Sequence, residues 1–141
     1  MKKDIVVVSG YFLAHVVEHS GYQTYIKAAR ELADKYNASL VAIISSTKQQ
    51  RMKYGRPIRD VADIVKEWCN YVDGCYVAID DDRTCRKTLE MLRDKFNKVI
   101  FFKSGGEYDL HNLPEAEVDG IKIVFDDSPK EASSSEILGL N

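Results

Sequence analysis

Two of the three histidines in this chain lie close together, in a segment that follows a short apolar run. His19 opens the sequence HSGY (19–22), and His15 stands four residues before it. A histidine beside exposed backbone N–H groups at the start of a helix can stabilise charge on a transferring phosphate. The same two side chains could instead be ordinary exposed loop histidines. Residue types alone leave both interpretations open.

Three further segments could contact a phosphate or a nucleotide. A basic segment with Pro57 after it could close over a triphosphate, or it could simply be a solvated loop. Paired glycines let the backbone approach a ligand, or they could form an ordinary turn. A serine run before Glu136 forms a capping-box pattern, and its hydroxyl and N–H groups could also bind phosphate. The basic segment contains Lys48, Arg51, Lys53 and Arg56. The segment with paired glycines contains Lys103, Gly105, Gly106 and Glu107, and the serine run is Ser133, Ser134 and Ser135.

The acidic run Asp80-Asp81-Asp82 could attract Mg²⁺, but a helix cap is the favoured interpretation, with Asp82 as the cap. Several well-known nucleotide and hydrolase motifs are absent from the sequence. It has no GxxxxGK[ST], no GxGxxG after the first apolar run and no GxSxG. P-loop, dinucleotide-binding and α/β-hydrolase chemistry are therefore disfavoured.

Composition narrows the class of protein. The 141 residues carry 20 basic and 22 acidic side chains, a net charge of −2, and 45% of them are hydrophobic. This balance argues against nucleic-acid or membrane-surface binding, which needs clustered basic charge. No apolar run approaches the roughly 18 residues of a membrane span, and the N-terminal run is too short for a signal peptide. We expect Cys69, Cys75 and Cys85 to be reduced thiols of a cytoplasmic protein, without a disulfide or metal.

Apolar runs and helical periodicity alternate along the chain. They predict strands at 4–8, 40–44, 75–79, 99–102 and 121–125, and helices at 21–36, 61–71, about 83–96 and 133–138. Segments 45–59 and 103–117 are predicted as loops or short turns. This order predicts one domain (1–141) with an α/β fold, a Rossmann-like doubly wound five-stranded parallel sheet with helices on both faces. Its ligand site is expected beyond the carboxyl ends of the strands.

Within the helices, apolar positions indicate which side faces the core. Residues Tyr22, Ile26, Ala29, Leu32 or Ala33, and Tyr36 recur at helical spacing, and so do Ile64, Val65 and Trp68. We expect both sets to face inward.

In their order and spacing these segments resemble the cytidylyltransferase-like nucleotidyltransferases, in particular glycerol-3-phosphate cytidylyltransferases and the nucleotidyltransferase domain of ADP-heptose-forming enzymes. In that family a Gly-x-Phe turn precedes a His-x-Gly-His motif. The resemblance spans nearly the whole chain, although each motif is weak by itself. The matching segments are VVVSGYF (6–12), HSGYQTYIKAARELAD (19–34), KYGRP (53–57), YVDGCYVAIDDDRTCRKTLEMLRD (71–94), SGGEYDLHNLPE (104–115) and SSSEIL (133–138).

The resemblance implies transfer of CMP from CTP, or AMP from ATP, to a small phosphorylated alcohol or sugar, with Mg²⁺ accompanying the nucleotide. It also implies a homodimer. His19 would touch the transferring phosphates, Lys53 would reach the triphosphate and Gly21 would permit close packing. The implied nucleotide-binding residues are Gly10, Tyr11, Phe12, Gly21, Lys103, Gly105, Gly106, Glu107, Ser133, Ser134 and Ser135.

The sequence departs from the family pattern at its central motif. Tyr22 stands where the second histidine is expected, and about three extra residues separate Phe12 from His19. An alignment without that insertion would put His19 at the second histidine but would shift the following helix. His15 could take the vacant role, and Arg59 and Lys130 could replace two family arginines. A slow enzyme, a rewired enzyme, a nucleotide-binding module without turnover and an interaction protein that keeps only the fold all stay open.

Overall fold

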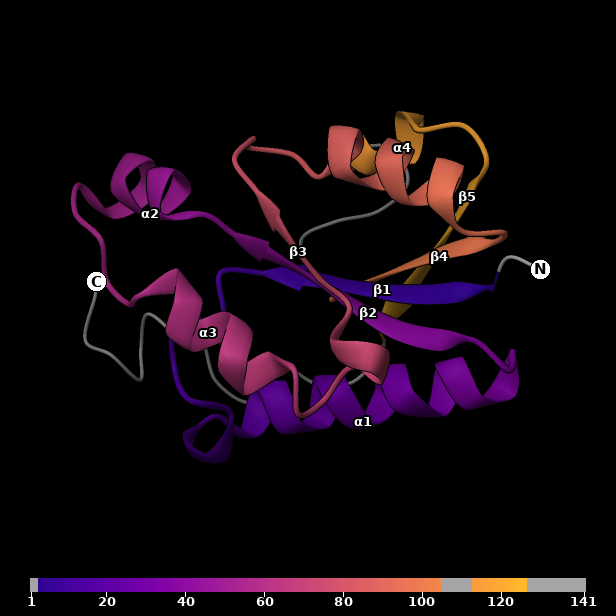
Figure 1. Cartoon of the computed structure of the whole chain (residues 1–141), viewed down its shortest axis with the longest axis horizontal. Coiled ribbons are helices and arrows are strands. Elements are labelled where there is room, and N and C mark those ends of the chain that lie inside the picture. Colours follow the sequence, from indigo (N-terminus) through magenta and orange to yellow (C-terminus); the bar gives the residue numbers. More distant parts are fainter. Residues whose placement is uncertain (1–2, 105–112, 127–141) are drawn as a thin grey trace.

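The structure, a computed structural model, describes residues 3–104 and 113–126. Within them, five parallel strands form a sheet in the order β3-β2-β1-β4-β5 (Figure 1). The strands are β1 (Ile5–Gly10), β2 (Ser39–Ser45), β3 (Val77–Asp80), β4 (Val99–Ser104) and β5 (Ile121–Asp126). The chain moves outward from β1 to β3 and returns to the other side of β1 at β4, which creates a switch point between β1 and β4. The predicted Rossmann-like α/β fold is confirmed.

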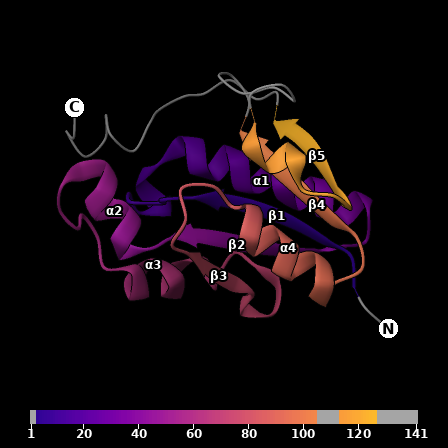
Figure 2. The ribbon, with the colours of Figure 1, turned by 90° about the horizontal axis from the view of Figure 1, so that it is seen from above.

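Helices cover both faces of this sheet. One face is covered by α1 (Ser20–Lys35) and α3 (Val61–Trp68), and the other by α4 (Arg86–Lys95) (Figure 1). The remaining helix, α2 (Thr47–Tyr54), lies beyond the carboxyl ends of the strands (Figure 2). Short 3-10 turns complete the described elements: η1 (Val16–Glu18), η2 (Asp73–Cys75) and η3 (Pro114–Glu117). None of the helices in the described ranges is long and apolar enough to cross a membrane.

Alternate residues of the central strands build two apolar layers, because successive side chains of a strand point to opposite faces. Both faces are buried, which explains why β1 and β2 appear in the sequence as unbroken apolar runs. The layer under α1 and α3 includes Val6, Val8, Leu40, Ala42, Ile44, Ile100 and Phe102. The layer under α4 includes Ile5, Val7, Val41, Ile43, Val99 and Phe101.

The predicted inward faces of α1 and α3 are largely correct. Ala29 and Ala33 are fully buried in α1, as are Ile64 and Trp68 in α3. Tyr36, in contrast, is exposed and is the C-cap of α1. Tyr36 follows the last residue of α1, so the helical period no longer sets the direction of its side chain, although the apolar pattern continues in the sequence.

The prediction of a loop at 45–59 is wrong, because α2 lies inside that segment. Its buried side chains are two glutamines, which periodicity of apolar residues cannot detect. Gln49 Nε2 donates to the Asp80 carbonyl (2.6 Å), and Gln50 Oε1 accepts from Ile58 N (2.7 Å). The local signals were present, since Ser46 is the N-cap and Gly55 ends the helix in the left-handed conformation.

The predicted helix at 83–96 starts three residues later, and Asp82 does not cap it. The helix begins at Arg86 with Cys85 in the cap position, and Glu115 Oε1 accepts from Cys85 N (3.1 Å). The carboxylate that serves this terminus therefore comes from a segment 30 residues away. Asp80 instead accepts from the backbone N–H of Asp82 (3.3 Å) and holds the preceding loop.

The expectation of three reduced thiols is also wrong. Cys69 and Cys75 form a disulfide between the end of α3 and η2, with 4.4 Å between their Cα atoms. The sequence suggested free thiols because the pair lacks familiar spacing, but the chain reverses direction after α3 and brings the two residues within bridging range. Of the three, Cys85 is the free cysteine. The cysteine content therefore no longer indicates a cytosolic setting.

Candidate active site

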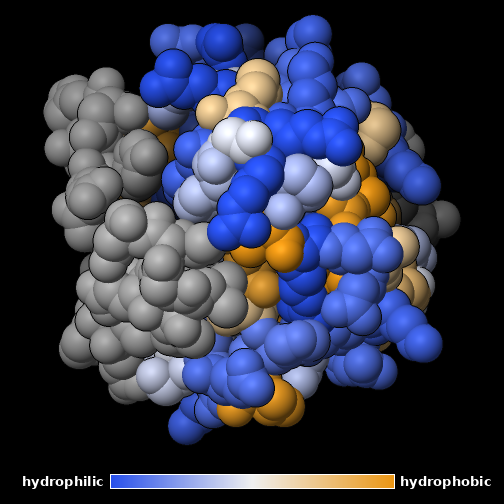
Figure 3. Space-filling view, turned by 90° about the vertical axis from the view of Figure 1, so that its left-hand side faces the viewer, coloured by the Kyte–Doolittle hydropathy of each residue, from blue (hydrophilic) through white to orange (hydrophobic). Residues whose placement is uncertain are grey.

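The carboxyl ends of the central strands lie level with one another. Gly10 is paired with Ile44, and Ile44 with Ile79, while β4 on the other side of β1 ends at Ser104. The loop after β1, the start of α1 and α2 all lie at this edge (Figure 1). The coloured residues seen along this edge are mostly hydrophilic, with apolar atoms visible between them (Figure 3). This is the edge at which a doubly wound sheet binds its ligand.

The turn after β1 depends on close packing between Gly10 and Phe12. Phe12 has a positive φ of 52° and is 4% exposed. A Cβ on Gly10 would lie 3.0 Å from the Phe12 ring, so only glycine fits without displacing it. The Phe12 ring packs on Trp68, with 3.9 Å between ring centroids. Phe12 therefore supports the turn from inside, whereas Gly10 and Tyr11 are the partly exposed members of the predicted nucleotide-binding turn.

His19 is a buried N-cap. Its side chain is at the first position before α1, and Nδ1 accepts a hydrogen bond from the Tyr22 backbone N–H (3.1 Å). A ring nitrogen that accepts carries no proton, so this contact assigns the neutral tautomer with its proton on Nε2. The imidazole is thereby fixed as a donor through Nε2 at the N-terminus of a 16-residue helix.

Tyr22 holds the His19 ring. The two rings are stacked, with 3.6 Å between centroids and 10° between planes. On its other sides Tyr22 contacts Phe12 (5.4 Å) and Trp68 (6.3 Å) edge-on. The tyrosine therefore packs against the core beneath the motif. Gly21 stands between His19 and Tyr22 in the sequence, in the first turn of α1.

His15 is directed to α3. Its Nδ1 lies 3.1 Å from Glu67 Oε2 and 3.0 Å from Arg59 Nη2. Arg59 also bonds Asp63 (2.7 Å) and reaches the carbonyl of Ala14 at 3.4 Å. These contacts tie the segment before α1 to α3. Both His15, considered for the vacant catalytic role, and Arg59, considered as a replacement arginine, belong to this ion-pair network.

Lys53 and Tyr11 lie close together in the structure. The Lys53 ammonium lies 4.7 Å from the centroid of the Tyr11 ring and 5.4 Å from that of Tyr54. Burial raises the pKa of Tyr11, Tyr54 raises it further, and the positive charge of Arg83 lowers it. Among the described residues, none of the four cations Lys48, Arg51, Lys53 and Arg56 has a carboxylate within salt-bridge distance.

Sequence reasoning missed a buried polar cluster below this edge. It consists of Asp80, Cys85 and Glu115, with Lys103 nearby at the end of β4. Burial, followed by the charges of Asp80 and Glu115, raises the pKa of the Cys85 thiol to about 12, and Lys103 acts in the opposite direction. Burial also raises the pKa of Asp80, which accepts from Thr88 Oγ1 (3.1 Å). The cluster fixes the loop between β3 and α4. Its one sequence signal was the Pro-Glu pair before β5.

The alternative of a Mg²⁺ site at Asp80-Asp81-Asp82 gains no support from the geometry. Across residues 3–104 and 113–126, no group of three His, Cys, Asp or Glu side chains could hold a metal ion. Several predicted site residues lie outside the described residues, and their roles stay predictions: Gly105, Gly106, Glu107, Lys130, Ser133, Ser134 and Ser135.

No protein-family model and no curated protein sequence matches this chain. Its structure resembles a solved one, the lipopolysaccharide core biosynthesis protein from Thermoplasma volcanium GSS1. The TM-score is 0.66 at 19% sequence identity, and the match covers 90% of this chain and 98% of the other. At this level of identity the likeness establishes a shared fold over nearly the full length of both chains.

Proposed function

We propose that this protein is a nucleotidyltransferase that transfers CMP from CTP, or AMP from ATP, to a small phosphorylated alcohol or sugar. An acceptor phosphate oxygen attacks the α-phosphorus, the bond from that phosphorus to the bridging oxygen breaks, and pyrophosphate leaves with the electron pair. A phosphate monoester is largely doubly ionised at neutral pH, because its second pKa is about 6. The attacking oxygen therefore needs no general base.

One observation carries the proposal: the His19 imidazole is held as an Nε2 donor at the N-terminus of α1, beside the turn after β1. A fixed donor and a helix N-terminus both stabilise negative charge that develops on a transferring phosphate. Lys53 would neutralise the triphosphate from α2, and Tyr22 would hold the imidazole. The fold, shared with a protein of lipopolysaccharide core biosynthesis, agrees with a biosynthetic transferase.

Mg²⁺ enters this proposal together with the nucleoside triphosphate. The described residues contain no three-ligand cluster for it, and Mg²⁺ commonly keeps waters and substrate phosphates as ligands. Gly105, Gly106 and Glu107 would lie near the base and ribose, and Ser133, Ser134 and Ser135 would close on the triphosphate. We also propose a homodimer, and a cytoplasmic location because the substrate is a nucleoside triphosphate.

The proposed reaction is tested by measuring turnover. We expect pyrophosphate release when the purified protein is incubated with CTP or ATP, Mg²⁺ and a panel of phosphorylated polyols and sugars. Release must depend on the acceptor, and the nucleotidyl product should appear in equal amount by mass spectrometry. If no acceptor gives pyrophosphate above the level of a His19→Ala control, the proposed reaction is refuted.

The stacking of Tyr22 on His19 favours one second candidate, a module that binds the nucleotide without turnover. The tyrosine occupies the place of a family histidine and packs into the core, so this chain has one imidazole fewer at the motif. Calorimetric binding of CTP or ATP in the absence of turnover would identify this function.

Both candidates predict a role for Lys53 in nucleotide binding. Replacing Lys53 with alanine should weaken CTP or ATP binding about tenfold, since a charged hydrogen bond is worth roughly 1.5–3 kcal/mol. Lys48→Ala is the matched control, because it removes the same charge from the same helix but leaves the Tyr11 contact intact. Calorimetry measures both variants. Equal losses would show that only the net charge of α2 matters.

A further inference from the structure

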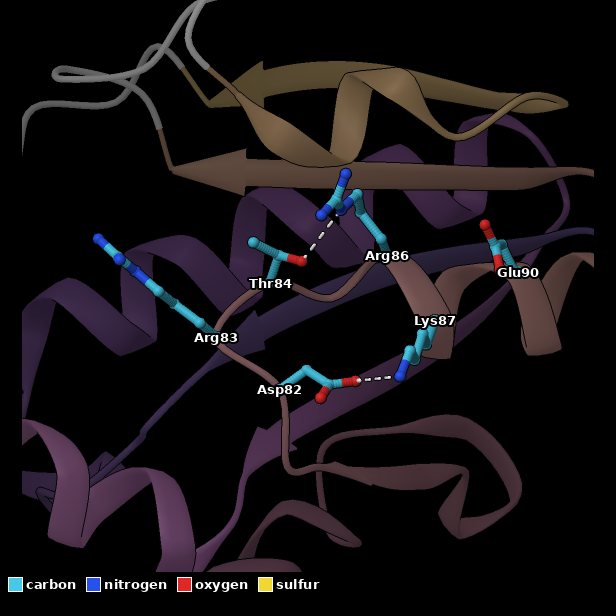
Figure 4. A pocket seen from close by; sticks show the side chains of 6 residues that line it. All are labelled: Asp82, Arg83, Thr84, Arg86, Lys87 and Glu90. Carbon is cyan, nitrogen blue, oxygen red and sulfur yellow. Dashed lines mark hydrogen bonds and ion pairs between the residues drawn. The ribbon is translucent and has the colours of Figure 1, made fainter.

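The loop between β3 and α4, together with the first turn of that helix, carries three cations around a polar pocket of about 560 Å³ (Figure 4). Two of them have acidic partners. Arg86 pairs with Glu117 at 2.8 Å, and Lys87 lies 3.9 Å from Asp82. The third, Arg83, has no carboxylate within salt-bridge distance in the described part of the chain. Of the three cations, Arg83 is therefore the one whose charge no described carboxylate neutralises.

Arg83 is directed away from the rest of the pocket. Its side chain extends in the opposite direction from Lys87 and Glu90, while Asp82 faces Lys87 (Figure 4). Arg83 follows β3 and Tyr11 follows β1, so both residues lie at the carboxyl edge of the sheet, on either side of the end of β2. The positive charge of Arg83 acts to lower the pKa of the Tyr11 phenol. Lys53 contacts the same ring from α2, at 4.7 Å. Two cations from different segments of the chain thus lie at the same edge of the sheet as Tyr11.

The loop that carries Arg83 is held in place on both sides. Before it, the buried Asp80 carboxylate accepts from Asp82 N (3.3 Å) and from the Thr88 hydroxyl (3.1 Å). After it, the buried Glu115 carboxylate accepts from Cys85 N (3.1 Å). An arginine on an anchored loop loses less conformational entropy when it binds, so its geometry is suited to recognising an anion.

We propose that Arg83 binds the phosphate of the acceptor at the carboxyl end of β1 and so selects phosphorylated over uncharged alcohols. The planar guanidinium donates two parallel N–H bonds to phosphate oxygens, which ammonium groups cannot do. Lys53 is left to the triphosphate. This inference rests on the proposed nucleotidyl transfer.

The test compares Arg83→Ala and Arg83→Lys with Lys87→Ala, a control that removes a charge from the first turn of α4, on the opposite side of the pocket. We expect Arg83→Ala to raise the acceptor KM about tenfold or more, and Arg83→Lys to restore only part of this because lysine lacks the bidentate geometry. The calorimetric Kd for CTP or ATP should stay at the wild-type value, and so should every parameter of Lys87→Ala. An unchanged acceptor KM, or a loss confined to nucleotide binding, would overturn the assignment.

A binding measurement separates this inference from the proposed reaction. Calorimetry with glycerol 3-phosphate and with glycerol, each in the presence of CTP or ATP, needs no turnover. Binding of the phosphorylated compound by wild type, and its loss in Arg83→Ala, would support Arg83 as the phosphate ligand even if no pyrophosphate is released. Equal binding of both compounds, or no binding of either by wild type, would refute it.

Discussion

Replacing His19 with alanine is expected to lower the rate of pyrophosphate release by about 10²–10³-fold, the usual cost of removing a donor directed at transition-state charge. The Nε2 proton is the donor, because Nδ1 accepts from Tyr22 N. The same substitution removes the N-cap of α1 and should lower the free energy of unfolding by about 0.5–2 kcal/mol. A rate measurement alone would not separate these two effects.

His19→Ser is the matched variant. A serine hydroxyl can cap α1 as the imidazole does, but it provides no ring donor. Both variants leave a void in place of a side chain that is 3% exposed. We expect equal losses of turnover, with greater resistance to urea unfolding for the serine variant. Retained turnover in His19→Ser would show that the histidine acts only as a cap.

Trp68→Ala is expected to give the largest loss of stability, about 3–5 kcal/mol, the usual range for truncating a buried tryptophan. Trp68 is fully buried and packs beneath the turn. Its ring centroid lies 3.9 Å from that of Phe12, 6.3 Å from that of Tyr22 and 6.1 Å from that of Tyr71. The loss is a large part of the 5–15 kcal/mol that is typical of a domain. Equilibrium unfolding in urea measures it.

Trp68→Phe tests the reason for that loss. The buried indole Nε1 has no hydrogen-bond partner within the described residues. Phenylalanine therefore removes a polar group without breaking a hydrogen bond, and it keeps most of the aromatic contact with Phe12. We expect it to cost well under half as much as alanine. Equal costs for the two variants would mean that packing on the turn is not what Trp68 contributes.

Contacts of the candidate site could be predicted where the residues are close in the sequence, and not where they are far apart. His19, Tyr22 and the turn at Gly10 lie within one strand-turn-helix segment, so their order in the chain already implied their neighbourhood. His15 is different, because its partner Glu67 lies 52 residues away. An exposed histidine in a loop gives no indication of such a partner, and its contact with Glu67 forms only when α3 packs against the segment.

The sequence by itself determined the sheet, both faces of its core and the start of α1. Burial on both faces requires unbroken apolar runs in β1 and β2, and the helical period sets the inward side of α1 through Ala29 and Ala33. These signals are local, because each depends on the residues of one segment and on the presence of a core to pack against.

Tertiary structure alone decided three features: the burial of Gln49 and Gln50 in α2, the capping of α4 by Glu115 and the Cys69–Cys75 disulfide. Each depends on contacts between groups that folding brings together, and in most cases these groups lie far apart in the chain. A buried glutamine or carboxylate is stable only where distant backbone groups bond to it. The pattern of apolar residues does not predict those contacts, so these features could be identified only from the folded structure.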